Sequence, residues 1–169
     1  MAYRAESIAN ELLDLSKQAG RKITQIEIQK LVYFSHGWNL ALRDQPLIGE
    51  LIEAWRYGPV VRTLYDAFKR FGSDPITEKA VSWRMGSNGR FDCETPVIQS
   101  DSPADDFYAR ELVNKVWQKY GSLTPFKLVE ITHLPDSPWR QAFEQNKPYI
   151  PNDSIKSYFK SLMAQGQNG

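Results

Sequence analysis

Apolar positions recur at helical spacing along most of the chain and predict a mainly α fold. A first helix is predicted over residues 3–19, with Gly20 at its end. A second begins at Thr24, because Thr24 and Glu27 have the T-x-x-E spacing of a capping box. Two faces of this second helix are apolar, so we expect it at the centre of the fold. Its apolar residues are Ile28, Leu31, Phe34, Trp38 and Leu42 on one face and Val32, Tyr33 and Leu40 on the other.

The pattern changes after residue 50. Residues 51–57 are expected to be a short extended segment, and Pro59 is expected to be the first residue of a third helix that ends at Gly72. In residues 81–94 apolar residues alternate with polar ones on both sides of a Gly86–Gly89 turn. This alternation predicts a β-hairpin attached to the helical core.

Helical spacing returns in the C-terminal half. A long helix is predicted to end near Gly121, and a final one to begin at about Asp153. Two shorter helices begin at Thr124-Pro125 and Ser137-Pro138, each a hydroxyl N-cap followed by proline. The sequence therefore predicts one compact domain over residues 1–163, with about seven helices and a small hairpin. Residues 164–169 are predicted to be a flexible polar tail.

Composition narrows the classes of function. The chain has 21 Lys and Arg against 20 Asp and Glu, so its formal charge of +1 creates no global field that attracts nucleic acid. No segment approaches the roughly 18 apolar residues that cross a bilayer, and nothing resembles a signal peptide. The single Cys93 excludes an intramolecular disulfide. A cytoplasmic protein without membrane insertion is expected.

Residues able to carry catalysis or bind a metal are few. His36 and His133 have no second ligand at a helical metal-binding spacing, so neither a metal nor a cofactor is expected. We interpret His36 as a buried structural histidine, His133 as a helix C-cap, and Cys93 as a small packed hydrophobe. No nucleophile elbow or phosphate-binding loop appears. These observations favour a binding protein over an enzyme.

The segment Trp55-Arg56-Tyr57 combines two aromatic residues and an arginine beside a rigid Gly-Pro turn, a combination able to anchor a partner. The equally weighted alternative is that Trp55 and Tyr57 pack the loop onto the core. The residues expected to bind a partner are Trp55, Arg56, Tyr57, Arg62 and Lys69, with Trp83 and Arg84 of the predicted hairpin as a second choice.

Several motifs together resemble the Panacea domain family. They are Ile23-Thr-x-x-x-Ile28-Gln-Lys-Leu-Val-Tyr-Phe34, Gly37-Trp38, Pro46-Leu47, Glu53-Ala-Trp-x-Tyr-Gly-Pro-Val60, Tyr65 and Phe68, then Leu128, Thr132-His133, Pro138-Trp139 and the closing Ile155 to Phe159. This resemblance covers nearly the whole chain.

The resemblance implies an antitoxin of a toxin–antitoxin pair, of a kind often carried on prophages and plasmids and linked to phage defence. Such a protein neutralises a cognate toxin, usually the product of the adjacent gene, by direct protein contact. Some relatives instead act as adaptors that deliver a toxin to a cellular protease. Two further alternatives are a DNA-binding autoregulator, using Arg56, Arg62, Lys69 and Arg70, and an enzyme with an unseen site. A homo-oligomer is compatible with each of these functions.

Overall fold

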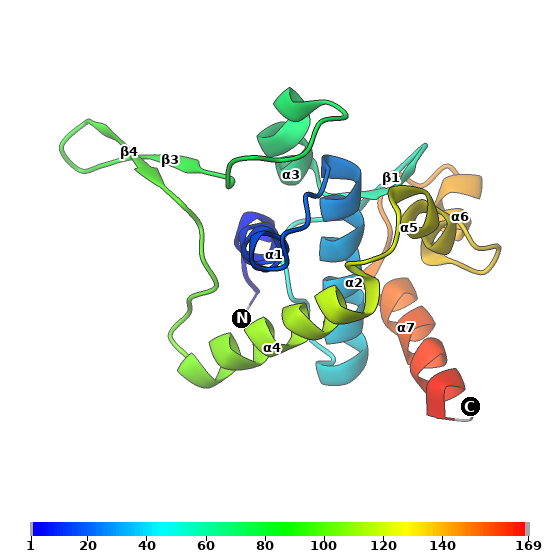
Figure 1. Cartoon of the computed structure of the whole chain (residues 1–169). Helices are drawn as coiled ribbons and strands as arrows, with labels where there is room; N and C mark the ends of the chain where they lie inside the picture. The colour runs from blue at the N-terminus through cyan, green and yellow to red at the C-terminus, as the bar shows by residue number, and fades with distance from the viewer. Residues whose placement is uncertain (1, 168–169) are drawn as a thin grey trace.

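The computed structural model describes residues 2–167, whose seven α-helices and two small antiparallel sheets form one body around a central helix (Figure 1). The elements in chain order are α1 (Ala5–Gln18), α2 (Gln25–Arg43), β1 (Glu53–Trp55), β2 (Gly58–Val60), α3 (Arg62–Phe68), the 3-10 turn η1 (Lys69–Phe71), β3 (Ser82–Met85), β4 (Phe91–Glu94), α4 (Pro103–Tyr120), α5 (Pro125–Thr132), α6 (Pro138–Glu144) and α7 (Asn152–Gln167). The predicted mainly α fold with a small β attachment is confirmed, with a second short hairpin added.

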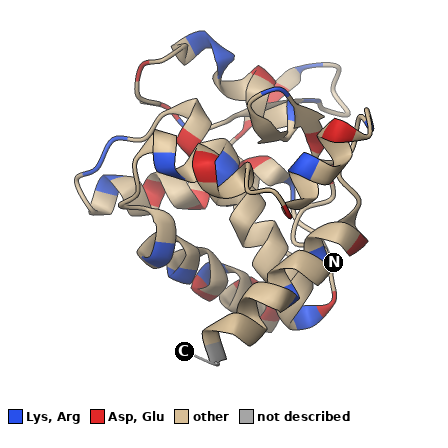
Figure 2. Ribbon diagram, turned by 90° about the vertical axis from the view of Figure 1, so that its right-hand side faces the viewer, with Lys and Arg blue, Asp and Glu red and all other residues tan. Residues whose placement is uncertain are grey.

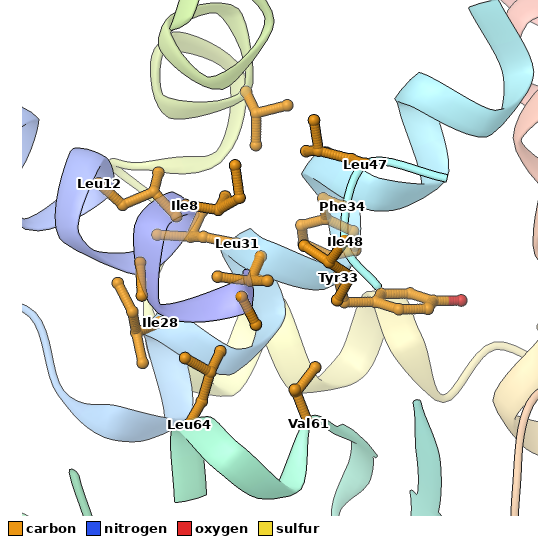
Figure 3. Packing of buried hydrophobic residues seen from close by; sticks show 14 of the residues in the cluster. Ile8, Leu12, Ile28, Leu31, Tyr33, Phe34, Leu47, Ile48, Val61 and Leu64 are labelled. Atoms are coloured by element: carbon orange, nitrogen blue, oxygen red, sulfur yellow. The ribbon is translucent and has the colours of Figure 1, made fainter. Parts of the chain in front are cut away.

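Helix α2 lies at the centre, as its two apolar faces predict. It packs against α1, α3, α4, α5, α7 and β2, and Ile28, Leu31 and Phe34 are fully buried along it. Figure 3 shows these residues meeting Ile8 of α1 and Leu64 of α3. The capping box is confirmed, with the Glu27 carboxylate accepting from the Thr24 N–H at 3.2 Å.

Helices α2 and α7 pack tightly against each other at Gly37. A Cβ atom at Gly37 would lie 2.3 Å from the Phe159 ring, so only glycine at this position lets the ring sit against the helix backbone. Tyr33 and Trp38 meet the same ring edge-on, at centroid distances of 5.9 and 5.2 Å. Residues from both apolar faces of α2 therefore pack against α7.

Local capping signals fix the starts of the C-terminal helices. The hydroxyl groups of Thr124 and Ser137 accept from the backbone N–H groups of Lys127 and Arg140, so both predicted N-caps are confirmed. Helix α7 continues to Gln167, four residues beyond the predicted boundary at 163. Of the predicted flexible tail, residues 168–169 lie outside the described residues.

The prediction for Pro59 is wrong. Pro59 lies in strand β2, opposite Ala54 of β1, and α3 begins only at Arg62. Side chains of α2 hold this segment extended: the Gln29 amide donates to the Val61 carbonyl at 3.1 Å and accepts from the Val61 N–H at 2.9 Å. These contacts span 32 residues, so local sequence could not reveal them.

The hairpin predicted at residues 81–94 is confirmed as β3–β4, which projects from the body at the left of Figure 1. We call residues 81–94 the arm. The interpretation of Cys93 as a packed hydrophobe is wrong, because its side chain is exposed. The strand pattern predicts which face Cys93 occupies, and Trp83, Met85 and Phe91 on the same face are exposed as well.

Candidate partner-binding surface

The turn between β1 and β2 presents Arg56 and Tyr57 to solvent, and we call these two residues the tip. Tyr57 is 70% exposed, and the Arg56 guanidinium lies 5.5 Å from the centre of its ring. A cation above an aromatic ring at this distance is a favourable pair. The tip therefore offers an aromatic and a cationic group together.

A buried lysine holds the tip from below. Lys30 of α2 is 2% exposed, and its ammonium donates to the carbonyl oxygens of Tyr57 at 3.0 Å and Pro59 at 3.2 Å. Gly58 has a φ of +114°, and a Cβ atom there would lie 2.6 Å from the Lys30 nitrogen. The turn thus requires glycine for its backbone conformation and for its contact with Lys30.

The environment of Lys30 also affects its protonation. Both partners at the tip are neutral carbonyl groups, and burial lowers the pKa of Lys30 to about 7. Lys30 is not among the site residues predicted from the sequence, since a lysine inside a helix is usually solvated. The one signal that could have found it is its place between the apolar residues Ile28 and Leu31.

Trp139 of α6 holds strand β1 next to the tip. Its indole N–H donates to the carbonyl of Trp55 at 2.6 Å, and its buried ring contacts His133 edge-on and stacks on Phe143. His133 is the C-cap residue of α5, with Nδ1 2.6 Å from the Val129 carbonyl, which confirms the capping interpretation. The C-terminal helices thereby brace the tip.

Trp55 belongs to the scaffold more than to the exposed surface. It is half-buried, its indole N–H donates to Glu53 at 2.6 Å, and its ring meets Tyr65 at a centroid distance of 4.9 Å. Arg62 lies over the same ring and pairs with Glu53 at 3.1 Å. Packing therefore accounts for Trp55, whereas Tyr57 points outward.

The exposed surface continues from the tip along α3. Tyr65 is part of this surface, and Lys69 lies 5.9 Å from its ring and pairs with Asp66 at 2.9 Å. We call the set Arg56, Tyr57, Arg62, Tyr65 and Lys69 the tip surface.

The structure does not bring the other two predicted residues to the tip. Trp83 and Arg84 lie on the arm, where Trp83 is exposed and Arg84 pairs with Glu94 at 3.3 Å. In Figure 1 the arm, α3 and β1 follow one another along the upper side of the molecule, so α3, which carries Arg62, lies between the arm and the tip. The seven predicted residues form two regions along one side.

His36 has the structural role predicted for it. Its buried ring accepts from the Ile48 N–H at Nδ1, and Nε2 lies 2.9 Å from the Asn152 side-chain oxygen. Burial lowers the pKa of His36, which favours the neutral ring. Within residues 2–167 no group of three or more His, Cys, Asp or Glu side chains is placed to hold a metal ion.

Charge is distributed without a dominant sign. Figure 2 shows basic and acidic positions interspersed over the ribbon. Three residues of the predicted basic patch are compensated by acids, since Arg62 pairs with Glu53, Lys69 with Asp66 and Arg70 with Glu78. No helix in the described part of the chain is long and apolar enough to cross a membrane.

Comparison with known proteins identifies the family. The family described as "Antitoxin SocA-like, Panacea domain" matches residues 28–140, a range that contains α2 almost entirely, the tip surface, the arm and Trp139. A curated relative, Antitoxin SocA from Caulobacter vibrioides, is 30% identical over 135 residues, which cover 80% of this chain and 68% of that protein. No solved structure matches the chain. The protein belongs to the SocA-like antitoxin family of Panacea domain proteins.

Proposed function

We propose that this protein is an antitoxin that neutralises a cognate protein toxin by direct contact through the tip surface. The observation that carries the proposal is the way the tip is anchored. Lys30 holds the turn backbone at two carbonyl groups, and Trp139 holds the adjoining strand, while Arg56 and Tyr57 remain exposed. Membership of an antitoxin family supports the same function.

A rigid tip suits a protein interface. Tyrosine and arginine are among the residues that contribute most to binding energy when a partner buries them. Association costs conformational entropy, and that cost is smaller when the contacting backbone is already fixed. The tip meets both conditions, because its backbone is held from the core and its two side chains face solvent.

The proposed partner is a toxin encoded by the adjacent gene, acting in the cytoplasm, and the proposed role is binding without catalysis. The compensated charges of Arg62, Lys69 and Arg70 support a protein partner over DNA. A promoter DNA fragment is therefore expected to show no mobility shift with this protein at low salt.

Co-expression tests the proposal. The wild-type chain should relieve growth arrest by the adjacent gene product and form a stable complex with it. The double variant Arg56→Ala/Tyr57→Ala should fail to rescue and should bind the purified toxin about 30-fold more weakly, as expected for a hot-spot pair.

Phe107→Ala is a matched control, since Phe107 is a 66% exposed aromatic residue on α4, outside the tip surface. It should rescue like the wild type. Rescue and tight binding by the tip variant would move the interface away from the tip surface, and no rescue by the wild type would remove the antitoxin proposal.

A further inference from the structure

The arm exposes one apolar face along its whole length. The register of β3 and β4 places Trp83 opposite Cys93 and Met85 opposite Phe91. Since opposite residues of an antiparallel pair share a face, these four side chains lie together. Trp83, Met85 and Phe91 are each about two-thirds exposed, at 66, 67 and 65%.

The other face of the arm is polar and satisfied by the protein itself. Arg84 lies opposite Asp92 in the ribbon and pairs with Glu94 at 3.3 Å. Ser82 accepts a hydrogen bond of 3.1 Å from Arg4, the residue that precedes α1. The two faces therefore differ, because the polar face is hydrogen-bonded to the rest of the protein and the apolar face is exposed to solvent.

A buried side chain clamps the base of the arm. The Asn10 amide of α1 donates to the carbonyl groups of Ala80 and Pro96, at 3.0 and 2.9 Å, and accepts from the Ala80 N–H at 2.8 Å. These partners lie just before β3 and just after β4, so one residue fixes both stems. The ribbon is thus held at its base while the rest projects (Figure 1).

Contiguous exposed apolar side chains mark interaction sites in soluble proteins. A two-stranded ribbon is also marginally stable by itself in water. Packing against a partner would cover the exposed apolar side chains and would stabilise the ribbon. The arm carries two arginines and two acidic residues, whose formal charges cancel, so its contact is selected by apolar shape and not by net charge.

The available area decides between a second copy and a different partner. A buried aromatic side chain covers about 150–250 Å², so the exposed parts of Trp83, Met85 and Phe91 supply on the order of 400 Å². A stable complex buries about 800 Å² per partner. Two arms stacked face to face would bury only about half of this area per partner. A different partner can surround the ribbon and extend its contact onto α3 and the tip.

We propose that the arm inserts its apolar face into an apolar groove of the toxin and extends the contact made by the tip surface. This inference rests on the proposed antitoxin function. The order of the arm, α3 and β1 along one side in Figure 1 is compatible with one partner that contacts all three.

The test compares the two faces of the same ribbon. Trp83→Ser/Phe91→Ser changes the apolar face, and the matched control Arg84→Ser/Asp92→Ser changes the opposed pair on the polar face. The apolar-face variant should bind the purified product of the adjacent toxin gene at least about 30-fold more weakly, while the control should stay within about threefold. Circular dichroism and the melting temperature should match the wild type for both variants, because all four positions are exposed.

Cys93 provides a second readout that needs no substitution. Its exposed thiol lies opposite Trp83 on the apolar face, so it should react quickly with a thiol reagent in the free protein. Saturation with the toxin should slow this reaction at least about tenfold, since a groove that buries the face excludes the reagent.

The outcomes separate this inference from the proposed function. Tight toxin binding by both the wild type and the apolar-face variant overturns the role of the arm and leaves the antitoxin function standing. Failure of the wild type to bind the toxin overturns both. A wild-type dimer in sedimentation that the apolar-face substitutions dissociate, with toxin affinity unchanged, assigns the arm to a second copy and also overturns the inference.

Discussion

The tip and the arm are both turns between two short antiparallel strands, but the core holds them differently. Side chains of α2 and α6 hydrogen-bond to the backbone on both sides of the tip, through Lys30 and Trp139. The arm is held at its stems by Asn10 and on its polar face by Arg4. Beyond these contacts the arm projects into solvent.

The difference shows that the exposure of each ribbon depends on how far the core reaches along it. Where the core reaches the strands, Trp55 is half-buried and only Arg56 and Tyr57 are presented. Where it does not, an entire apolar face remains open, including Trp83 and Phe91. The tip is therefore suited to a preorganised contact, and the arm to one that is completed by the partner.

The largest expected effect concerns Lys30 and pH. Folded Lys30 loses its proton near pH 7, whereas an unfolded lysine holds it to about 10.4, so the unfolded state binds more protons between these values. The free energy of unfolding should therefore rise with pH, by about 1.4 kcal/mol per unit above pH 7. From pH 7, where Lys30 is half deprotonated, to pH 9 the rise should be about 2 kcal/mol in urea titrations.

Lys30→Met should remove most of this slope, because no proton is then displaced by folding. Lys127→Met, at an exposed lysine of α5, should retain it. A wild-type stability that stays flat from pH 7 to pH 9 would contradict the described state of Lys30.

The next effect compares one glycine from each turn. Gly58→Ala forces a side chain into a backbone with φ of +114° and against Lys30, so it should lower the free energy of unfolding by about 2 kcal/mol. Gly89→Ala in the arm, with φ of +76° and open space around it, should cost about 1 kcal/mol. Equal losses in urea unfolding would mean that the tip is not held as described.

A smaller effect is expected from removing one indole donor in each region. Trp139→Phe leaves the Trp55 carbonyl without its 2.6 Å partner and should cost about 1–2 kcal/mol. Trp83→Phe changes an exposed ring of the arm and should alter stability by less than about 0.5 kcal/mol. Thermal melts of the two variants should be measured beside the wild type. If the arm were the better packed region, Trp83→Phe would lose more stability than Trp139→Phe.

The smallest effect is expected at Cys93 in the free protein. Because its side chain is exposed, its reaction with a thiol reagent should be nearly as fast in the native state as in concentrated urea. A native rate far below the unfolded rate would show that another element covers the arm. The reaction rate measured in the free protein is then the reference for the rate measured with bound toxin.

The starts of α2, α5 and α6 follow from the sequence because their causes are local. Periodicity placed the apolar stripes, and the hydroxyl-proline pairs Thr124-Pro125 and Ser137-Pro138 fixed two helix starts within the residues that form them. Alternation around Gly86–Gly89 similarly located the hairpin of the arm. Motifs spread over the chain indicated the family, which the comparisons confirm.

The tertiary structure alone decided how the two turns are presented. Pro59 has the local signature of a helix start, yet Gln29 and Lys30 hold its neighbourhood in an extended strand from about thirty residues away. Lys30 is a polar residue type, but its position in the fold buries it. Cys93 belongs to an apolar face that remains uncovered. In each case the outcome depends on which groups another segment brings to that place, and that information is not contained in a local pattern of residues.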